Sequence, residues 1–318
     1  MLNPLQLQTL QTVLRTGSFA DAARELGYTG SAVSQQISAL ERATQTQLFE
    51  RGAHGVSPTA MAVFVAERAN QVLGQLRTLE DDIVLRQSGV IGQIRVGCFP
   101  TAAERLLPAA LSRFRYTHPA VAVHLDEGEP GELFDLLEAC ELDVAVIYRY
   151  GAVPHRLPRE FDSELLIREG LYLLVPDGHP RLRSGETIGL EDLRDDAWIT
   201  SRVGTAGASA LRRLCARADF APAITHRSNN YDVIHGLVRA GLGIAVVPEL
   251  GRRQTDGVRC LRVDGEHAYR EVLALRSRAL ADGAWKGVLA ALGSATAALG
   301  SPSHTEPVVL VPGELTTP

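Results

Sequence analysis

The pattern of apolar and polar positions is most informative before residue 60. Ser18 can accept hydrogen bonds from the free amides of a helix start, and Asp21, three residues on, is placed to reach back as in a capping box. Gly27 ends this helix, and after one tight turn Thr29 is placed to cap a second helix. Apolar residues at i, i+4 and i+7 then define one buried stripe, formed by Val33, Ile37 and Leu40. The pattern predicts a helix-turn-helix.

The opposite face of the second helix carries short hydroxyls and amides, where a plain solvated helix more often shows Lys and Glu. Side chains of this kind can read base edges in the major groove of duplex DNA. The alternative is a polar surface on an ordinary three-helix cluster. The candidate DNA-contacting residues of this helix are Ser31, Ala32, Ser34, Gln35, Gln36 and Ser38.

A short loop punctuated by glycine follows, over residues 53–59. Such a loop is of the kind that forms a wing. Arg51 stands at its start and is the candidate for contact with a phosphate or a narrow minor groove.

Taken together, these segments resemble the winged helix-turn-helix of LysR-type transcriptional regulators. The resemblance implies a double-stranded DNA operator and a small-molecule effector as partners, with RNA polymerase as a further candidate partner. Two positions depart from the family pattern: Gly30 stands where a base-contacting Gln is common, and Gln45 where a Gly is usual. The matching segments are Ser18-Phe19, Ala22-Ala23, Leu26, residues 32–37, Leu40-Glu41, residues 48–51 and Pro58-Thr59.

Charge adds little to this picture. The whole chain has a formal net charge of −5, and the arginines before residue 60 are balanced by acidic residues. Affinity for phosphate should therefore be modest, and DNA binding must rest on helix N-termini, backbone amides, a few arginines and the avidity of a dimer.

A long helix is predicted from about residue 59 to residue 86, with apolar residues spaced alternately by three and four. At 1.5 Å per residue it would be about 40 Å long, more than the small domain before it can cover. The spacing predicts a coiled-coil seam and hence a homodimer, in agreement with the linker helix of the family, whose members often pair dimers into tetramers. The alternative is an intramolecular core helix. The seam comprises Ala62, Val65, Ala69, Val72, Leu76, Leu79 and Ile83.

After residue 92 short apolar runs alternate with helical patterns, which predicts an α/β architecture. Two lobes joined by crossovers near residues 160–165 and 262–270 would enclose a cleft, as in the effector domain of the family, which resembles periplasmic binding proteins. The predicted strands are 94–97, 121–125, 143–148, 171–175, 198–200, 224–227, 244–247 and 271–275, and the predicted helices are 102–115, 130–139, 206–218 and 231–240.

Polar residues at helix starts after strands are the candidate effector ligands, because such clefts bind ligands where helix N-termini present free amides. The alternative for each Thr and Asn is a helix cap and nothing more. Arg149 follows a strand and can pair with a carboxylate in the same cleft. The favoured ligand is a small anionic metabolite. The candidates are Thr101, Arg149, Thr200, Ser201, Arg202, Asn229 and Asn230.

Signals for an enzyme are poor. Gly241 and Gly243 lie between a helix and the following strand, where a helix C-cap is expected and a dinucleotide-binding loop is not. The histidines lack ligand spacing, and Cys98, Cys140, Cys215 and Cys260 form no C-x-x-C pair, so we expect buried thiols and neither metal nor cofactor. A solute-binding protein, or an enzyme with an accessory helix-turn-helix, remains the alternative.

The resulting fold class is α/β with a mostly helical N-terminal domain. We expect a winged helix-turn-helix over residues 1–58, a dimerisation helix over 59–88 and an effector-binding domain over 92–299. Within it, one lobe takes about 92–162 and 266–299, the other about 163–265, and a disordered tail occupies 300–318. The first residues form no charged-then-apolar signal and no apolar run reaches transmembrane length, which predicts a cytoplasmic protein without a membrane partner.

Overall fold

The computed structural model describes residues 2–52, 55–87, 92–154, 157, 161–180, 188–277, 285–299 and 308–310 of the 318-residue chain. The chain forms two compact units. One contains residues 1–95 with the short segments 120–122 and 134–143, and the other contains the remainder.

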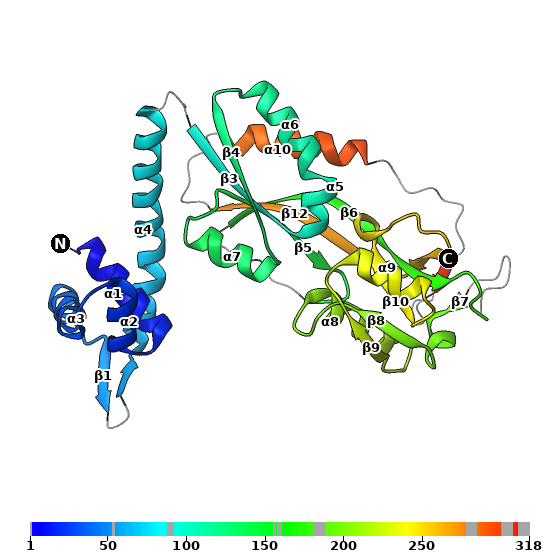
Figure 1. Ribbon diagram of the computed structural model, residues 1–318, viewed down its shortest axis with the longest axis horizontal. Helices are drawn as coiled ribbons and strands as arrows, with labels where there is room; N and C mark the ends of the chain where they lie inside the picture. The colour runs from blue at the N-terminus through cyan, green and yellow to red at the C-terminus, as the bar shows by residue number, and fades with distance from the viewer. Residues whose placement is uncertain are drawn as a thin grey trace. The chain divides into compact units, whose positions relative to one another are not determined.

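The N-terminal unit begins with three helices and a two-stranded antiparallel hairpin (Figure 1). The helix caps are as predicted: Ser18 Oγ accepts from the amide of Asp21, and Thr29 Oγ1 accepts from the amide of Ala32 at 3.2 Å. The capping box also predicts a hydrogen bond from the Ser18 amide to the Asp21 carboxylate, and this prediction is wrong. The Asp21 carboxylate contacts Arg24 instead. The elements are α1 (Pro4–Thr16), α2 (Phe19–Leu26), α3 (Gly30–Thr44), β1 (Phe49–Gly52) and β2 (Gly55–Pro58).

One apolar core holds these elements together. Val33, Ile37 and Leu40, the predicted stripe of α3, are almost completely buried in it. They pack with Leu10 of α1 and with Leu48 before the hairpin. Burial of such side chains contributes about 1.5–3 kcal/mol each, which fixes the orientation of α3 and leaves its polar face outward.

The long helix α4 (Ala60–Gln87) has the predicted extent, but its apolar residues divide between two faces. Ala62 and Ala69 of the predicted seam are buried in the core of the N-terminal unit, and Leu76 packs partly against it. Val72, Leu79 and Ile83 are about half exposed. The seam is therefore partly intramolecular, because its first half covers the chain's own helices.

The chain from residue 92 onward lies mostly in the second unit and forms an α/β fold in which helices cover a mixed sheet (Figure 1). Its principal strands are β3 (Gly92–Cys98), β4 (Val121–Glu127), β5 (Val144–Tyr150), β6 (Phe161–Pro176), β8 (Ala197–Thr200), β9 (Ala223–Arg227), β10 (Ile244–Pro248), β11 (Val258–Asp264) and β12 (Tyr269–Ser277). Its helices are α5 (Pro100–Arg105), α6 (Leu107–Thr117), α7 (Pro130–Glu138), α8 (Ala206–Arg217), α9 (Tyr231–Arg239), the short η1 (Leu190–Leu193) and η2 (Glu249–Gly251), and α10 (Trp285–Ala298).

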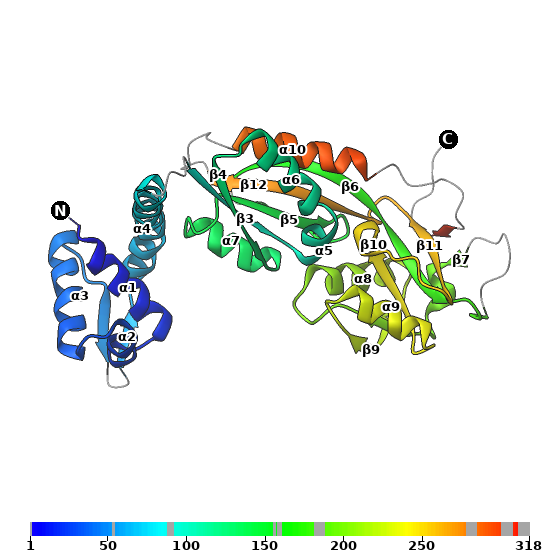
Figure 2. The same ribbon diagram turned by 45° about the horizontal axis from the view of Figure 1, so that its top comes forward.

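The sheet runs in the order β4-β3-β5-β12-β6-β10-β8-β9 and defines two lobes. Strand β6 belongs to both (Figure 2): residues 161–170 pair with β12, and residues 171–176 pair with β10 and β11. The crossover expected near 160–165 is therefore a continuous strand. The predicted return of the chain to the first lobe is correct, because β12 pairs with β5.

Several elements differ from the sequence predictions. The helix expected over 102–115 is two helices that meet at Leu106, because Pro108 cannot donate an amide hydrogen bond inside a helix. Strand β11 and helix α10 were not predicted, and α10 lies beside α6. The short strands are β7 (Ile188–Gly189) and β13 (Val308–Leu310), the latter within the tail that was expected to be disordered.

Candidate functional site

The exposed face of α3 carries the polar residues singled out from the sequence. Ser31 and Gln35 are exposed, and the Ser31 hydroxyl lies 2.9 Å from that of Thr29. Arg51 belongs to β1, but its side chain lies outside what the structure describes. Partly exposed positions complete the face: Ala32, Ser34, Gln36 and Ser38. Short polar side chains on a helix held by its opposite face match the geometry of a recognition helix.

A small cavity of about 30 Å³ lies where both lobes of the second unit contribute side chains. A cavity of this size accommodates water and is far below the 300–1,000 Å³ of common ligand sites. It adjoins two larger pockets, of about 320 and 410 Å³, which share lining residues with it. The central cavity is lined by Phe99, Pro100, Thr101, Glu129, Tyr148, Tyr150, Ser201, Thr205, Gly207, Ser228, Asn229, Tyr231 and Arg270.

Arg270 of β12 is the positive group of this cavity and is only 1% exposed. Its Nε donates to Glu169 Oε1 at 2.5 Å, and its Nη2 donates to Thr101 Oγ1 at 3.3 Å. The guanidinium carbon lies 4.9 Å from the ring centre of Phe99 and 5.0 Å from that of Tyr148. Burying a charge without a partner costs free energy. The ion pair with Glu169 and the contacts with the two aromatic rings stabilise the buried guanidinium.

Three tyrosines provide the hydroxyl groups of the cavity. Tyr148 donates to Glu129 Oε2 at 2.6 Å, and the hydroxyls of Tyr150 and Tyr231 interact with each other. Burial, reinforced by neighbouring hydroxyls and carboxylates, raises the pKa of all three tyrosines, including that of Tyr148. They therefore stay protonated at neutral pH. Tyr148 already donates its one hydroxyl proton to Glu129, and one tyrosine of the Tyr150–Tyr231 pair donates to the other, so the pair has one hydroxyl proton left for a ligand.

The two lobes also touch directly at the cavity. Asn229, at the start of α9, donates from Nδ2 to Glu129 Oε1 at 3.3 Å, and Glu129 belongs to the first lobe. Asn229 Oδ1 accepts from the backbone amide of Arg202 at 2.9 Å. These contacts hold the loop after β8 and the start of α9 in fixed positions around the cavity.

The predicted effector ligands are only partly brought together. Thr101, Ser201 and Asn229 line the central cavity. Asn230 lines the adjoining 410 Å³ pocket, but its carbonyl oxygen already accepts from the amides of α9 as a helix cap. Thr200 is buried and lines a cavity of about 20 Å³ that also adjoins the central one.

Arg149 and Arg202 are placed differently from the prediction. Arg149 Nε donates to Glu271 Oε2 at 2.6 Å, so its charge is paired with a carboxylate of the protein itself, which also binds Arg168. Its side chain lines the 320 Å³ pocket and not the central cavity. The described contacts of Arg202 in this region are through its backbone: its amide donates to Asn229, and its carbonyl oxygen accepts from the Thr205 hydroxyl.

Sequence reasoning missed Arg270, Glu169 and the three tyrosines. A signal was present in β12, where Arg270 alternates with Val272 and Ala274 on a face that is fully buried. A charged residue at a buried strand position requires a partner, and such pairs concentrate at functional sites. The partner Glu169 lies about a hundred residues earlier, so the pair itself has no local signature.

The thiols of Cys98, Cys140 and Cys215 are buried, as predicted, whereas the prediction is wrong for Cys260, which is partly exposed. Burial raises the pKa of Cys98 and of Cys215 to about 12, so neither is a reactive thiolate at neutral pH. Within the described residues, no cluster of His, Cys, Asp and Glu is arranged to hold a metal ion. No helix among the described segments is long and apolar enough to cross a membrane.

Comparison with known families covers nearly the whole chain. Residues 5–63 match the bacterial regulatory helix-turn-helix protein of the lysR family, and residues 87–295 match the LysR substrate binding domain. The chain is 30% identical over 220 residues to the transcriptional dual regulator GltC of Bacillus subtilis, covering 69% of this chain and 71% of that protein. It is 32% identical over 245 residues to the regulator GalR of Pseudomonas putida, covering 76% of this chain and 60% of that protein.

Solved structures show the same fold. CbnR in complex with its target DNA has a TM-score of 0.60 at 21% identity, over 92% of this chain and all of that one. A full-length OxyR variant from Pseudomonas aeruginosa also has a TM-score of 0.60 at 21% identity, over 92% of this chain and 95% of that one. The two family matches together with the winged helix-turn-helix place the chain in the LysR family: it is a DNA-binding transcription regulator with an effector-binding domain, and not an enzyme.

Proposed function

We propose that the regulator responds to a small anionic metabolite that binds between the two lobes of the effector domain. The observation that carries the proposal is the cavity around Arg270, to which both lobes contribute hydrogen-bonding side chains. Polar groups that converge on one cavity, with a buried charge among them, are the usual signature of a small-molecule site.

The donors suit an anion even though Glu169 balances the charge of Arg270 and a second carboxylate, that of Glu129, lines the cavity while accepting from Tyr148 and Asn229. Thr101 and Ser201 supply hydroxyls, and the Tyr150–Tyr231 pair supplies one further donor. The N-terminus of α8 borders the same space through Thr205 and Gly207, and its free amides and dipole favour negative charge. The ligand's charge would thus be met by hydrogen bonds and the helix end.

Binding must rearrange the lobes, because the central cavity is too small for a metabolite. The adjoining pockets of about 320 and 410 Å³ are large enough once they merge with it. A ligand that prefers a more open arrangement of the lobes shifts the population toward it, and this preference is what makes binding regulatory.

A thermal-shift titration with small carboxylates tests the effector site. A cognate carboxylate should raise the melting temperature and alter the DNA footprint, and Thr101→Val should reduce both responses because it removes a hydroxyl at nearly constant volume. Thr296→Val, in α10 outside the cavity, is the matched control. An undiminished shift and footprint change in Thr101→Val would contradict the assignment.

We further propose that α3 contacts the bases of the operator and that Arg51 binds the phosphate backbone or the minor groove of the DNA. Gln35→Ala should relax base discrimination, whereas Arg51→Ala should weaken binding to all sequences. Gel-shift titration against the upstream intergenic region separates the two effects. If both variants kept the affinity and selectivity of the wild type, this surface would not be the DNA interface.

A further inference from the structure

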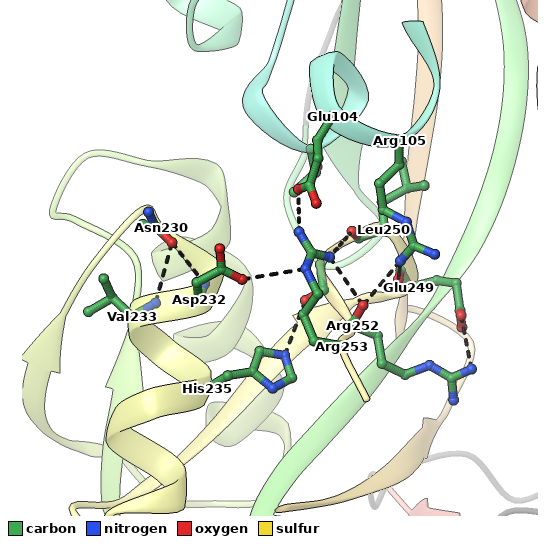
Figure 3. Close-up of polar contacts among 12 residues, drawn as sticks. Glu104, Arg105, Asn230, Asp232, Val233, His235, Glu249, Leu250, Arg252 and Arg253 are labelled. Carbon is green, nitrogen blue, oxygen red and sulfur yellow. Dashed lines mark hydrogen bonds and ion pairs between the residues drawn. The ribbon is translucent and has the colours of Figure 1, made fainter. Parts of the chain in front are cut away.

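A second concave site lies where α5 meets the segment after η2, apart from the central cavity (Figure 3). Arg105 of α5 comes from the first lobe, and Arg252 and Arg253 come from the second. These three guanidinium groups border a pocket of about 400 Å³, together with Thr255 and Cys260. The size is within the range of small-molecule sites.

The three arginines of the pocket differ in how their charges are paired. The guanidinium of Arg253 contacts the carboxylates of Glu104 and, at 3.5 Å, Asp232, which line the 410 Å³ pocket. Arg252 pairs with Glu249 at 3.1 Å, the carboxylate that lines the pocket itself. Glu249 therefore meets the charge of Arg252, and two carboxylates meet that of Arg253. Among the described contacts, this leaves Arg105 as the arginine of the pocket that is not paired with a carboxylate.

Arg105 is the group best placed to receive a ligand. In the described part of the chain, its contacts are with backbone carbonyls: Nη1 donates to the oxygens of Arg252 at 3.1 Å and of Glu249 at 3.4 Å. A neutral carbonyl does not balance a full positive charge, so an anion would make a stronger, charge-assisted hydrogen bond to the same guanidinium.

Neighbouring groups restrict the arginines. The Arg252 guanidinium carbon lies 4.5 Å from the ring centre of Tyr172, and the side chain is 25% exposed. Such stacking fixes the planar fork that binds two phosphate oxygens at once. Arg252 and Arg253 are recessed, which suits a small ligand in the pocket better than a DNA backbone passing over the surface.

We propose that this pocket is a second effector site, which binds a small phosphate-bearing molecule through Arg105 and Arg252. The second effector site is also connected to the effector site around Arg270 by a shared lining residue. Arg253 lines this pocket and the 410 Å³ pocket beside the central cavity, where it lies with Thr101 and Asn230. Because Arg105 and Arg252 come from different lobes, a phosphate held by both stabilises one lobe arrangement, and the two ligands affect each other's affinity.

Calorimetric titration of the full-length protein with inorganic phosphate and with glycerol 3-phosphate tests the site. We expect saturable binding, and we expect Arg105→Gln to weaken it about tenfold by removing a charge-assisted hydrogen bond. Arg252→Gln should act similarly. Arg213→Gln, an exposed arginine of α8, is the matched control and should leave the affinity unchanged. Tighter binding of the ester than of phosphate identifies a phosphorylated metabolite as the ligand, and the reverse order identifies free phosphate.

The wild-type protein offers a readout that needs no substitution in the pocket. Cys260 lines it and is partly exposed, whereas the other cysteines are buried. Phosphate at ten times its dissociation constant should slow alkylation of Cys260 by iodoacetamide about tenfold.

Two results would overturn the proposal. One is the absence of both saturable phosphate binding and protection of Cys260 in the wild type. The other is an Arg105→Gln variant that binds phosphate like the wild type. If this variant also loses affinity for DNA, Arg105 is a DNA contact instead.

Discussion

Gln45 ends α3 in the left-handed region, with a φ of 53°. A residue with a Cβ is strained there by about 1 kcal/mol, whereas Gly27 ends α2 with a φ of 69° without that strain. Gln45→Gly should therefore raise the free energy of unfolding by about 0.5–1 kcal/mol in urea titrations, and Gly27→Ala should lower it by about 1 kcal/mol. A less stable Gln45→Gly variant would show that contacts of the Gln45 side chain outweigh the strain.

His235 of α9 should make stability depend on pH. The ring is 3% exposed, with Nε2 donating to the carbonyl of Gly251 at 3.2 Å and Nδ1 3.2 Å from the Thr255 hydroxyl. Burial, aided by Arg253, lowers the pKa of His235 below its usual 6.5. The unfolded state therefore binds the proton more tightly, so stability is complete above about pH 6.5 and declines as the pH falls below it.

Denaturant titrations between pH 7 and pH 5 measure this effect. The loss of stability on acidification should be smaller in His235→Gln than in the wild type, although this variant is less stable at pH 7. His226→Gln, a partly exposed histidine of β9, is the control and should keep the wild-type pH dependence. Equal slopes in the wild type and His235→Gln would refute the assignment.

Residues of the DNA-binding unit could be predicted from the sequence more fully than residues of the effector cavity. Caps and stripes such as Thr29 and Val33 were predicted correctly because their partners lie within four residues. Arg270 was missed because its partners, Glu169 and Thr101, are more than a hundred residues away. Arg149 was assigned to a ligand because sequence gives no sign that Glu271 lies opposite it on β12.

Among the elements, α4 carries the clearest testable surface. Leu79 and Ile83 are about half exposed, and apolar side chains at heptad spacing predict a partner helix. Leu79→Glu combined with Ile83→Glu should break the dimer while the monomer stays folded, since neither residue belongs to the core of the N-terminal unit. Leu76 does pack on that core and is unsuitable for the test.

Analytical ultracentrifugation at micromolar concentration measures the effect. Val63→Glu, an exposed apolar position off the seam, is the control and should remain dimeric. A monomeric wild type, or a double variant that sediments as a dimer, would refute the role of this seam.

At the scale of elements, sequence predicted local units well and their connections less well. Helices α8 and α9 were located within about one residue, because a cap and an apolar period define each of them. The break at Leu106 was missed, although Pro108 signals it. Strand β6 was expected to begin after a crossover, since its polar residues near 162–164 hide a strand that pairs with β12.

For the molecule as a whole, the shared strand β6 has a consequence for how the effector domain unfolds. Its 16 residues hydrogen-bond with β12 in one lobe and with β10 and β11 in the other. Neither lobe can lose its sheet without removing a strand from the other, so the lobes should form a single cooperative folding unit. Loss of ordered structure in one should then expose the backbone amides of both.

Native-state hydrogen exchange measures this coupling. Amides of Ala245 in β10 and Ala274 in β12 should exchange with the same free energy and the same dependence on urea. Leu173→Ala, in the second-lobe part of β6, should lower both values equally, whereas Leu40→Ala in the N-terminal unit should lower neither. Separate values for the two amides would show independent lobes. A shared foldon implies that a fragment containing either lobe alone cannot fold, and that a destabilising substitution anywhere along β6 reduces the cellular level of the whole regulator.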